Sequence, residues 1–507
     1  MRYIKSFSNA DAIQAAVDNN TLGKPYVALN EATGAIDWNS KEKGPSAQYF
    51  TIEVISAGTV NLTLADGVNM QYSVDSGETW QSNASINAQP GDKIMYKGTN
   101  NTLAPQAFIS YSVFSGSSAY YNAYGNIMSL LYGDNFIGQT SLADNVTAIF
   151  YNLFSNSHLV DASNLILPAT TFGQGPYNGM FENCTNLTAA PALPATTLTM
   201  DCYANMFRGC TSLTAAPELP ATSLASSCYS QMFMGCTSLT TAPSELPATT
   251  LEERCYYRMF NGCTSLATAP ELPATTLTKY CYASMFQGCT SLTSTPELPA
   301  ATLKINSYFY MFSGCTSLNY VKCLATDISA SNCTYEWVAG VAASGTFVRD
   351  ASMTGWTTGD SGIPSGWVTL DNPTHTTGVW LKAGSTEIEG VLSDGTYNFT
   401  PTEGIEGDAS LVIDGKYMVV NGNACGFYHD CMGEINDSEG GPDPNSGGFI
   451  KCSEVETGVY KVGHAIPIIG ATYNPSSSTL TLNTHYQEEC PEPEPEPGEP
   501  EEEPGEN

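Results

Sequence analysis

A nearly verbatim repeat occupies the middle of this 507-residue chain and limits what it can fold into. The text GCTSLTAAPELPATSL begins at Gly209, and close copies begin at Gly235, Gly262 and Gly288. The cysteine of the GC pair recurs at successive steps of 26, 26, 27, 26 and 26 residues. A fixed period of this length is typical of a solenoid, in which each coil buries its apolar side only by stacking on its neighbours. The repeat therefore predicts a rod-like array whose length is set by copy number.

Each coil combines three short pieces. The segment CYANMFRGC places its Tyr, Met and Phe at one-turn spacing, which predicts a short helical turn that Gly209 can end in a left-handed conformation. The following SLTAAP predicts a short strand with Leu213 and Ala215 pointing inward. The prolines of PELP lack backbone donors and turn the chain toward the next coil.

Two ladders of cysteine run through the array. Partners eight residues apart across a helical turn would lie about 12 Å from each other, beyond the reach of a disulfide. Equivalent cysteines on stacked coils come closer, but their side chains run parallel. We therefore predict buried thiols that act as small apolar fillers. The first ladder is Cys184, Cys210, Cys236, Cys263, Cys289 and Cys315, and the second is Cys202, Cys228, Cys255 and Cys281.

The remaining text predicts a multidomain, mainly β protein. Short alternating strands separated by Gly- and Asp-rich turns flank the array, and three tryptophans (Trp337, Trp356 and Trp367) occur where the repeats stop, as a cap would require. We expect a small α-β-β N-terminal module at 1–45, a β-sandwich-like domain at 46–124, the solenoid with a cap at each end at 125–371, a C-terminal β domain at 372–487 and a disordered Pro/Glu tail at 488–507.

The N-terminal module cannot bury much surface alone, so we expect it to dock on a partner or on its own protein. A helix is predicted over 11–17, followed by strands in YVALN and AIDWN. Alternatively, residues 1–45 form a leading helix and the first hairpin of the following β domain. The expected anchor residues are Tyr3, Ile4, Phe7, Val27, Leu29 and Trp38.

The charge balance excludes some partners. Fifty acidic residues against 18 basic ones give a formal net charge of -32, which argues against nucleic acid or an anionic membrane as a ligand. The N-terminal text has no apolar signal-peptide core, and no stretch approaches the 18 apolar residues of a spanning helix. We expect neither Sec export nor membrane insertion.

The repeat MFxGCTSLTxAPELPATTL resembles the leucine-rich repeats of the Bacteroides surface protein A type, closely between Cys184 and Cys315. Flanking text such as ILPATTF at 166–172 and SGIPSGW at 361–367 resembles the ends of such arrays. The resemblance implies an adhesin or surface-exposed binding protein of gut bacteria, or of phages that infect them.

The N-terminal text MRYIKSFSN and KPYVALNEATGAIDWN resembles the opening segments of virion and fibre proteins in Bacteroides phages, including crAss-like phages. That resemblance implies a phage structural protein that displays a host-derived surface module. It agrees with the expectation of no signal peptide, because phage particles assemble in the cytoplasm.

Residue patterns for catalysis or cofactor binding are weak. None of the five histidines lies in a Ser-His-Asp, HExxH or nucleophile-elbow context, and no phosphate-binding glycine loop occurs. The spacing of Cys425, His429 and Cys431 fits no zinc pattern well, so a structural role is favoured over metal binding. We expect no enzyme activity, no cofactor and no metal, with a polysaccharide-degrading fibre enzyme as the contrary hypothesis.

Surface recognition remains as the expected role. The coils carry few charges but many Ser, Thr and Tyr residues, which could hydrogen-bond carbohydrate or protein, or could merely keep the rod soluble. Together with the resemblances, this predicts a head fibre on the virion surface that is a homodimer or homotrimer. We expect its N-terminal module to contact other virion proteins and its array to contact a host surface glycan, protein or mucus. A tail fibre or a bacterial surface adhesin is the alternative.

Overall fold

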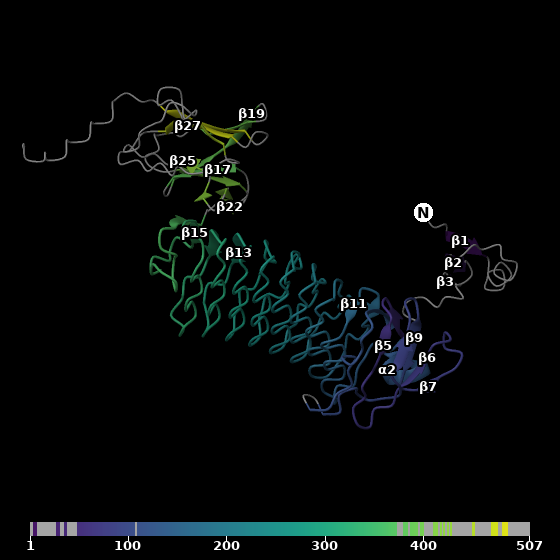
Figure 1. The fold of residues 1–507 in the computed structure, drawn as a ribbon. Helices are drawn as coiled ribbons and strands as arrows, with labels where there is room; N and C mark the ends of the chain where they lie inside the picture. Colours follow the sequence, from purple (N-terminus) through teal and green to yellow (C-terminus); the bar gives the residue numbers. More distant parts are fainter. Residues whose placement is uncertain are drawn as a thin grey trace, which may run out of the picture. The chain divides into compact units, whose positions relative to one another are not determined.

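The computed structural model describes residues 48–106 and 109–372 continuously, together with separate strands within 4–37 and 379–484 (Figure 1). Two compact units divide the chain, Met1–Leu370 and Asp371–Asn507. The described residues are mainly β and turn, with one four-residue helix, α2 (Ser129–Tyr132).

The N-terminal segment contains a three-stranded sheet. Strands β1 (Ile4–Phe7) and β2 (Val27–Asn30) are parallel, and β2 pairs antiparallel with β3 (Ala35–Asp37). Strands β2 and β3 lie in the two segments expected to be strands, whereas β1 was not predicted. The helix predicted over 11–17 lies outside the described residues.

The next region forms one main sheet in the order β11-β10-β4-β9-β6-β7, with β12 also on β10, and a separate pair β5-β8. The strands are β4 (Phe50–Val54), β5 (Gly58–Val60), β6 (Gln71–Ser73), β7 (Gln81–Ser82), β8 (Ile86–Ala88), β9 (Lys93–Lys97), β10 (Tyr121–Asn126), β11 (Leu159–Asp161) and β12 (Leu165–Ile166). Strand β10 is antiparallel to β4 but parallel to β11 and β12.

The expectation of a separate antiparallel sandwich is therefore wrong in one respect. Strand β10 crosses the expected boundary after residue 124 and pairs with the first strands of the array. A single buried core runs from Phe50 to Trp367 without a break between the two regions. The sheet thus covers the open N-terminal end of the array, because exposed strand edges and unburied coil faces are costly.

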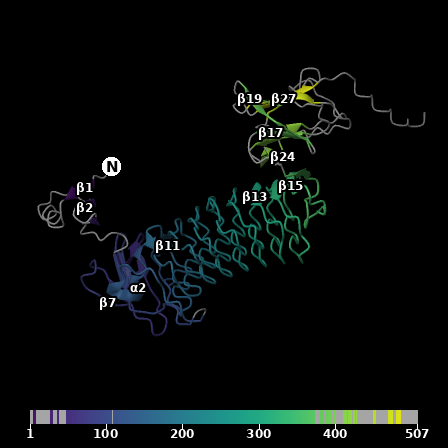
Figure 2. The same cartoon turned by 180° about the vertical axis from the view of Figure 1, so that it is seen from behind.

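The coils stack side by side along the array in both views (Figures 1 and 2). The segment predicted as a helical turn is instead a run of consecutive tight turns. Alternate amides, such as Ala204 N, donate to the carbonyl three residues back. The amides between them, such as Tyr203 N, donate to the next coil, in this case to Cys228 O. Asp201, Asn205 and Gly209 have φ of 56°, 56° and 73°, so every fourth residue is left-handed. The left-handed Gly209 is confirmed, but it ends a series of turns.

The strand segment of each coil is also shorter than expected. Leu213 is fully buried as predicted, but Ala215 is exposed and makes an isolated parallel bridge to Thr241 of the next coil. Longer parallel strands appear only toward the end of the array, in the order β13-β14-β15-β16. These are β13 (Ser294–Leu298), β14 (Tyr320–Cys323), β15 (Thr346–Arg349) and β16 (Val368–Asp371).

Aromatic ladders run through the core. The rings from Phe181 to Phe312 stack coil upon coil, with centroids 5.3 to 5.6 Å apart, and a parallel ladder joins Tyr177 to Tyr308. Trp337 stacks on Tyr308 and on Trp356, and so closes the Tyr ladder where the sequence predicted a cap. Each stacked pair adds about 0.5–1.5 kcal/mol beyond area burial.

The second unit contains two five-stranded sheets, in the orders β18-β17-β21-β22 with β25 on β21, and β19-β20-β27-β28-β26, and a pair β23-β24. Its strands are β17 (Val379–Ala383), β18 (Thr386–Glu389), β19 (Val391–Ser393), β20 (Thr396–Phe399), β21 (Ala409–Ile413), β22 (Lys416–Tyr417), β23 (Val419–Val420), β24 (Asn423–Ala424), β25 (Gly426–Phe427), β26 (Phe449–Lys451), β27 (Ile468–Asn474) and β28 (Thr479–Thr484). The acidic tail predicted at 488–507 lies outside the described residues.

Candidate binding surface

The cysteine ladders lie inside the array. The twelve cysteines from Cys184 to Cys333 are buried and free. In the first ladder each thiol donates to a phenylalanine carbonyl of the preceding coil, as Cys236 Sγ does to Phe207 O at 3.1 Å. Cysteine therefore fills a small apolar site and also satisfies a buried carbonyl, a role that the sequence did not indicate.

Burial keeps these thiols neutral. It raises the pKa of Cys184, Cys236 and Cys315 to about 12, and raises the pKa of Cys210 well above the usual range. Because the thiolate is the nucleophile and metal ligand, the ladders are chemically inert at neutral pH. They belong to the scaffold, and the surface must carry any recognition.

Of the expected anchor residues, the N-terminal sheet contains four. Ile4 and Phe7 belong to β1, Val27 and Leu29 belong to β2, and Ile4 pairs with Val27 in the parallel register. Tyr3 and Trp38 lie outside the described residues, so the anchor itself stays a prediction.

The run of turns gives the array a side that we call the turn face. It consists of the positions equivalent to Met200, Asp201, Ala204, Asn205 and Arg208 in each coil. Met200 is exposed, Asp201, Asn205 and Arg208 are partly exposed, and Ala204 is buried. Side chains at equivalent positions of successive coils form columns, because the amides of this segment bond from one coil to the next.

Residue type varies along the turn face and hardly at all inside the array. We compare the five coils 199–224, 225–251, 252–277, 278–303 and 304–329. In all five, the buried columns that begin at Tyr203, Met206 and Phe207 hold Tyr, Met and Phe, respectively. Four turn-face columns each hold five different residues. They are Met200, Ser226, Glu253, Lys279 and Ile305; Asp201, Ser227, Arg254, Tyr280 and Asn306; Asn205, Gln231, Arg258, Ser284 and Tyr310; and Arg208, Met234, Asn261, Gln287 and Ser313.

Exposure alone does not explain this variation. The column that begins at Thr211 is exposed in every coil and yet is always threonine. Its hydroxyls donate to carbonyls of the preceding coil, as Thr290 Oγ1 does to Thr264 O at 3.3 Å. A threonine there stabilises the stack, so the constant columns follow from the fold.

Two of the variable columns contain bulky residues at positions where the backbone is left-handed. Arg254, Arg258, Tyr280 and Tyr310 have φ between 51° and 56°, in the left-handed region that favours Gly and Asn. A bulky residue in that region costs about 1–2 kcal/mol. Bulky side chains thus occupy positions of the turn face at which the backbone favours Gly or Asn.

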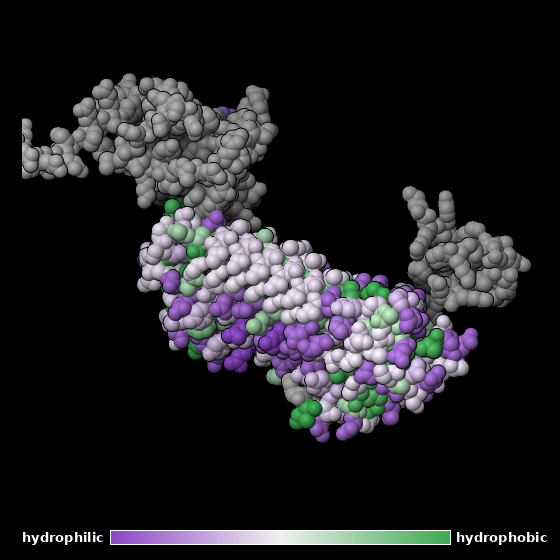
Figure 3. All heavy atoms as spheres, viewed as in Figure 1, coloured by the Kyte–Doolittle hydropathy of each residue, from purple (hydrophilic) through white to green (hydrophobic). Residues whose placement is uncertain are grey.

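Another side of the array is chemically uniform. Figure 3 shows a broad pale area on which residues of intermediate hydropathy, such as Ser and Thr, lie in parallel rows. Threonine hydroxyls of the array are in part engaged with the stack, as in Thr240 Oγ1 to Thr214 O at 3.1 Å. This side agrees with the hydroxyl-rich surface expected from the sequence, but it repeats the same chemistry in every coil.

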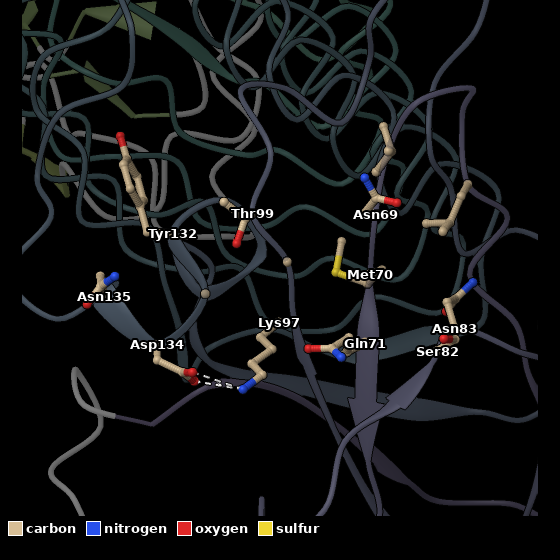
Figure 4. Close-up of a pocket in the computed structure, with 14 residues that line it drawn as sticks. Asn69, Met70, Gln71, Ser82, Asn83, Lys97, Thr99, Tyr132, Asp134 and Asn135 are labelled. Atoms are coloured by element: carbon tan, nitrogen blue, oxygen red, sulfur yellow. Dashed lines mark hydrogen bonds and ion pairs between the residues drawn. The ribbon is translucent and has the colours of Figure 1, made fainter.

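An open polar depression of about 650 Å³ lies beside the main sheet (Figure 4). Lys97 Nζ binds Asp134 at 2.9 and 3.1 Å and lies 4.2 Å from the centroid of the Trp80 ring. The Tyr49 hydroxyl donates to Asp134, and burial, with that bond, raises the pKa of Tyr49 to about 12. These groups satisfy one another, so the depression is a weaker candidate than the turn face.

Two further findings concern the described residues alone. They contain no helix with the length and apolar character to cross a membrane, and no group of three or more His, Cys, Asp or Glu arranged to hold a metal ion. Cys425, His429 and Cys431 lie outside them.

Comparison with known proteins supports the repeat architecture. Residues 132–240 and 227–334 match the family described as BspA type Leucine rich repeat region (6 copies). This part of the chain is thus a leucine-rich-repeat solenoid with coils of about 26 residues. No curated protein matches the chain.

One solved structure is also similar, a leucine-rich repeat protein from Bacteroides ovatus ATCC 8483. It has 17% sequence identity and a TM-score of 0.22, and the match covers 50% of this chain and 73% of that chain. At these values the similarity carries no argument about function.

Proposed function

We propose that this protein is a non-enzymatic binding protein whose array presents the turn face to a partner on the host surface or in mucus. The observation that carries the proposal is that the four columns with five different residues in five coils lie on the turn face, together with bulky residues at left-handed positions. A rigid, constant scaffold with a variable side is suited to recognition.

We further propose that the protein is a phage virion fibre, on the head and held there by its N-terminal module. The support is the resemblance of the N-terminal text to fibre proteins of Bacteroides phages. A homodimer or homotrimer would present several arrays at once, so weak contacts would gain from multivalency. A tail fibre or a bacterial surface adhesin with the same repeats is the second candidate, favoured by the repeat family itself.

Immunogold labelling of purified phage, with antibody against residues 184–315, tests the location. Gold over capsids is the expected result, and gold at tails would assign the protein to adsorption. Bare particles together with labelled host envelopes would contradict the virion proposal and leave the adhesin.

Binding of the purified chain to host cells and mucus tests the role of the turn face. A variant with Arg254→Asp, Tyr257→Ala and Arg258→Asn copies the side chains of the first coil onto the third. Loss of binding by this variant is expected, with unchanged binding when Thr268→Ala alters an exposed position elsewhere in the same coil. Equal binding by all three proteins would overturn the proposal.

A further inference from the structure

Aromatic and basic side chains gather on one part of the turn face. We call this the aromatic–basic patch, and it consists of Arg254, Tyr257, Arg258, Tyr280, Phe309 and Tyr310. These residues come from three coils, and equivalent positions in the first coil hold Asp201, Ala204 and Asn205. The patch is therefore a local feature of the array and not a consequence of the repeat.

The two arginines pack on tyrosines. The guanidinium carbon of Arg254 lies 5.0 Å from the centroid of the Tyr280 ring, and that of Arg258 lies 5.1 Å from the centroid of Tyr257. Cation–π attraction favours keeping each guanidinium beside its ring. The Nε atom of Arg258 is buried and has no hydrogen-bond partner among the described residues.

A second aromatic group borders the patch. Phe309 meets Tyr310 edge to face at 4.5 Å and stacks with Tyr335 at 5.5 Å, between ring centroids. Hydrogen bonding to the Glu336 carboxylate raises the pKa of Tyr335 to about 12, and Tyr335 is 41% exposed. These rings are held by one another, so they form a preorganised surface.

Small residues separate the two groups. Ala283 lies between Tyr257 and Phe309 in one column, and Ser284 lies between Arg258 and Tyr310 in the next. Ala283 and Ser284 are 0% and 2% exposed, and the equivalent Ala204 is 3% exposed, so burial belongs to these positions of the coil. The two buried residues separate the partly exposed rings and cations of the coils on either side.

The charge of the patch is opposite to that of the whole protein. In a chain of net charge -32, Arg254, Arg258, Lys279 and Lys304 come from neighbouring coils of one side. Arg254 pairs with Glu253 at 3.4 Å. Arg258, Lys279 and Lys304 make no ion pair within 4.0 Å among the described residues. Lys304 nevertheless lies near the Asp327 carboxylate, and the Glu336 carboxylate bonds Tyr335. Arg258 and Lys279, beside partly exposed rings, are the cations that favour an anionic ligand.

We propose that the aromatic–basic patch binds an acidic polysaccharide, in which sugar rings pack on the tyrosine and phenylalanine rings and carboxylate or sulfate groups bind Arg258 and Lys279. This inference rests on the proposed binding function and names the ligand class. Charge complementarity to Arg258 and Lys279 is the reason for choosing a polyanion. A protein partner is the outcome that the test distinguishes, because Tyr and Arg are also enriched in protein interfaces.

The test uses the purified full-length chain and calorimetric or biosensor titration with four probes. Polygalacturonate and dextran sulfate carry anionic groups on sugar rings, dextran is the neutral match of dextran sulfate, and poly-L-glutamate carries charge without sugar rings. Binding to the first two is expected, with weakening as salt rises. Little binding to dextran and weaker binding to poly-L-glutamate are expected.

Matched variants locate the site. Arg258→Gln copies the residue that Gln231 supplies in the same column, and Tyr310→Ser copies Ser284, so the fold already accommodates both. Each is expected to weaken binding to polygalacturonate by about tenfold. Lys93→Gln is the control, because it removes an exposed cation of β9, outside the turn face.

Several outcomes would overturn the inference. They are no binding to either acidic polysaccharide, equal binding to poly-L-glutamate, or equal losses in the Lys93 and Arg258 variants. If these results occur while the three-substitution variant still loses binding to host cells, the binding function stands and the ligand is of another class, such as a protein.

Discussion

The guanidinium of Arg254 lies 5.0 Å from the ring centroid of Tyr280, although both residues have φ of 56°. Two bulky side chains thus meet across neighbouring coils at positions where the backbone favours Gly or Asn. The contact recovers part of the cost of two strained residues. It also shows how the scaffold tolerates side-chain variety on one side without change in its core.

Arg258→Asn is expected to stabilise the protein. Asparagine adopts the left-handed φ of this position more readily than arginine does, so backbone strain falls. The substitution also removes the buried Arg258 Nε that has no hydrogen-bond partner, although it loses the cation–π contact with Tyr257. The free energy of unfolding should rise by about 1 kcal/mol. Chemical denaturation measures the change. The converse variant, Asn205→Arg in the same column, should lower it, and a rise in both would contradict the argument from backbone strain.

Phe260→Ala is expected to be strongly destabilising. Phe260 is fully buried and stacks at 5.5 Å on both Phe233 and Phe286, so the variant leaves a cavity inside the ladder. The free energy of unfolding should fall by about 3–5 kcal/mol. Thr268→Ala, at an exposed position of the same coil, should change it by less than about 0.5 kcal/mol. Similar effects of the two substitutions would refute a continuous core.

The thiols should be protected from reagents in the folded state. Cys184 to Cys333 are buried and free, so an aromatic disulfide reagent at pH 8 should modify none of these twelve until the chain is unfolded. Peptide mapping after modification with and without denaturant counts them. Recovery of disulfide-linked peptides from a denatured, non-reduced sample would show that the ladders are oxidised.

Stability should fall in alkali. Burial raises the pKa of Cys184 and Cys236 to about 12, whereas an unfolded thiol has a pKa near 9.0. Below pH 9 these thiols are protonated in both the folded and the unfolded chain, so they do not lower the free energy of unfolding. Between about pH 9 and 12 only the unfolded state releases it, which lowers stability by about 1.4 kcal/mol per pH unit for each thiol. Thermal unfolding in reductant at pH 7, 9 and 10.5 tests this. An unchanged Tm would contradict neutral buried thiols.

Removal of the cap should loosen the end of the array first. Trp356 stacks on Trp337 at 5.7 Å and meets Phe347 edge to face at 5.3 Å. In Trp356→Ala, amides of residues 304–329 should exchange faster with deuterium, because each coil depends on its neighbour. Residues 225–251 serve as the internal comparison. Uniform acceleration throughout the array would argue for global destabilisation instead of fraying.

The period, the stacking of the coils and the residues of the core could all be predicted from the repeat. Leu213, the cysteine ladders and the Tyr, Met and Phe columns recur at one spacing, and only stacked coils bury all of them at once. The tryptophan cap could also be predicted, because an open coil must be covered.

The form of the turns and the set of exposed side chains depend instead on hydrogen bonds between coils. Tyr, Met and Phe at this spacing also fit a helix, but amides such as Tyr203 N find their acceptors in the next coil, which no local pattern reveals. The left-handed positions at Asp201 and Asn205, and hence the columns that carry Arg258 and Tyr310, follow from those bonds between coils. The outward position of Ala215 and the continuation of β10 into the array were decided in the same way, by hydrogen bonds to distant segments.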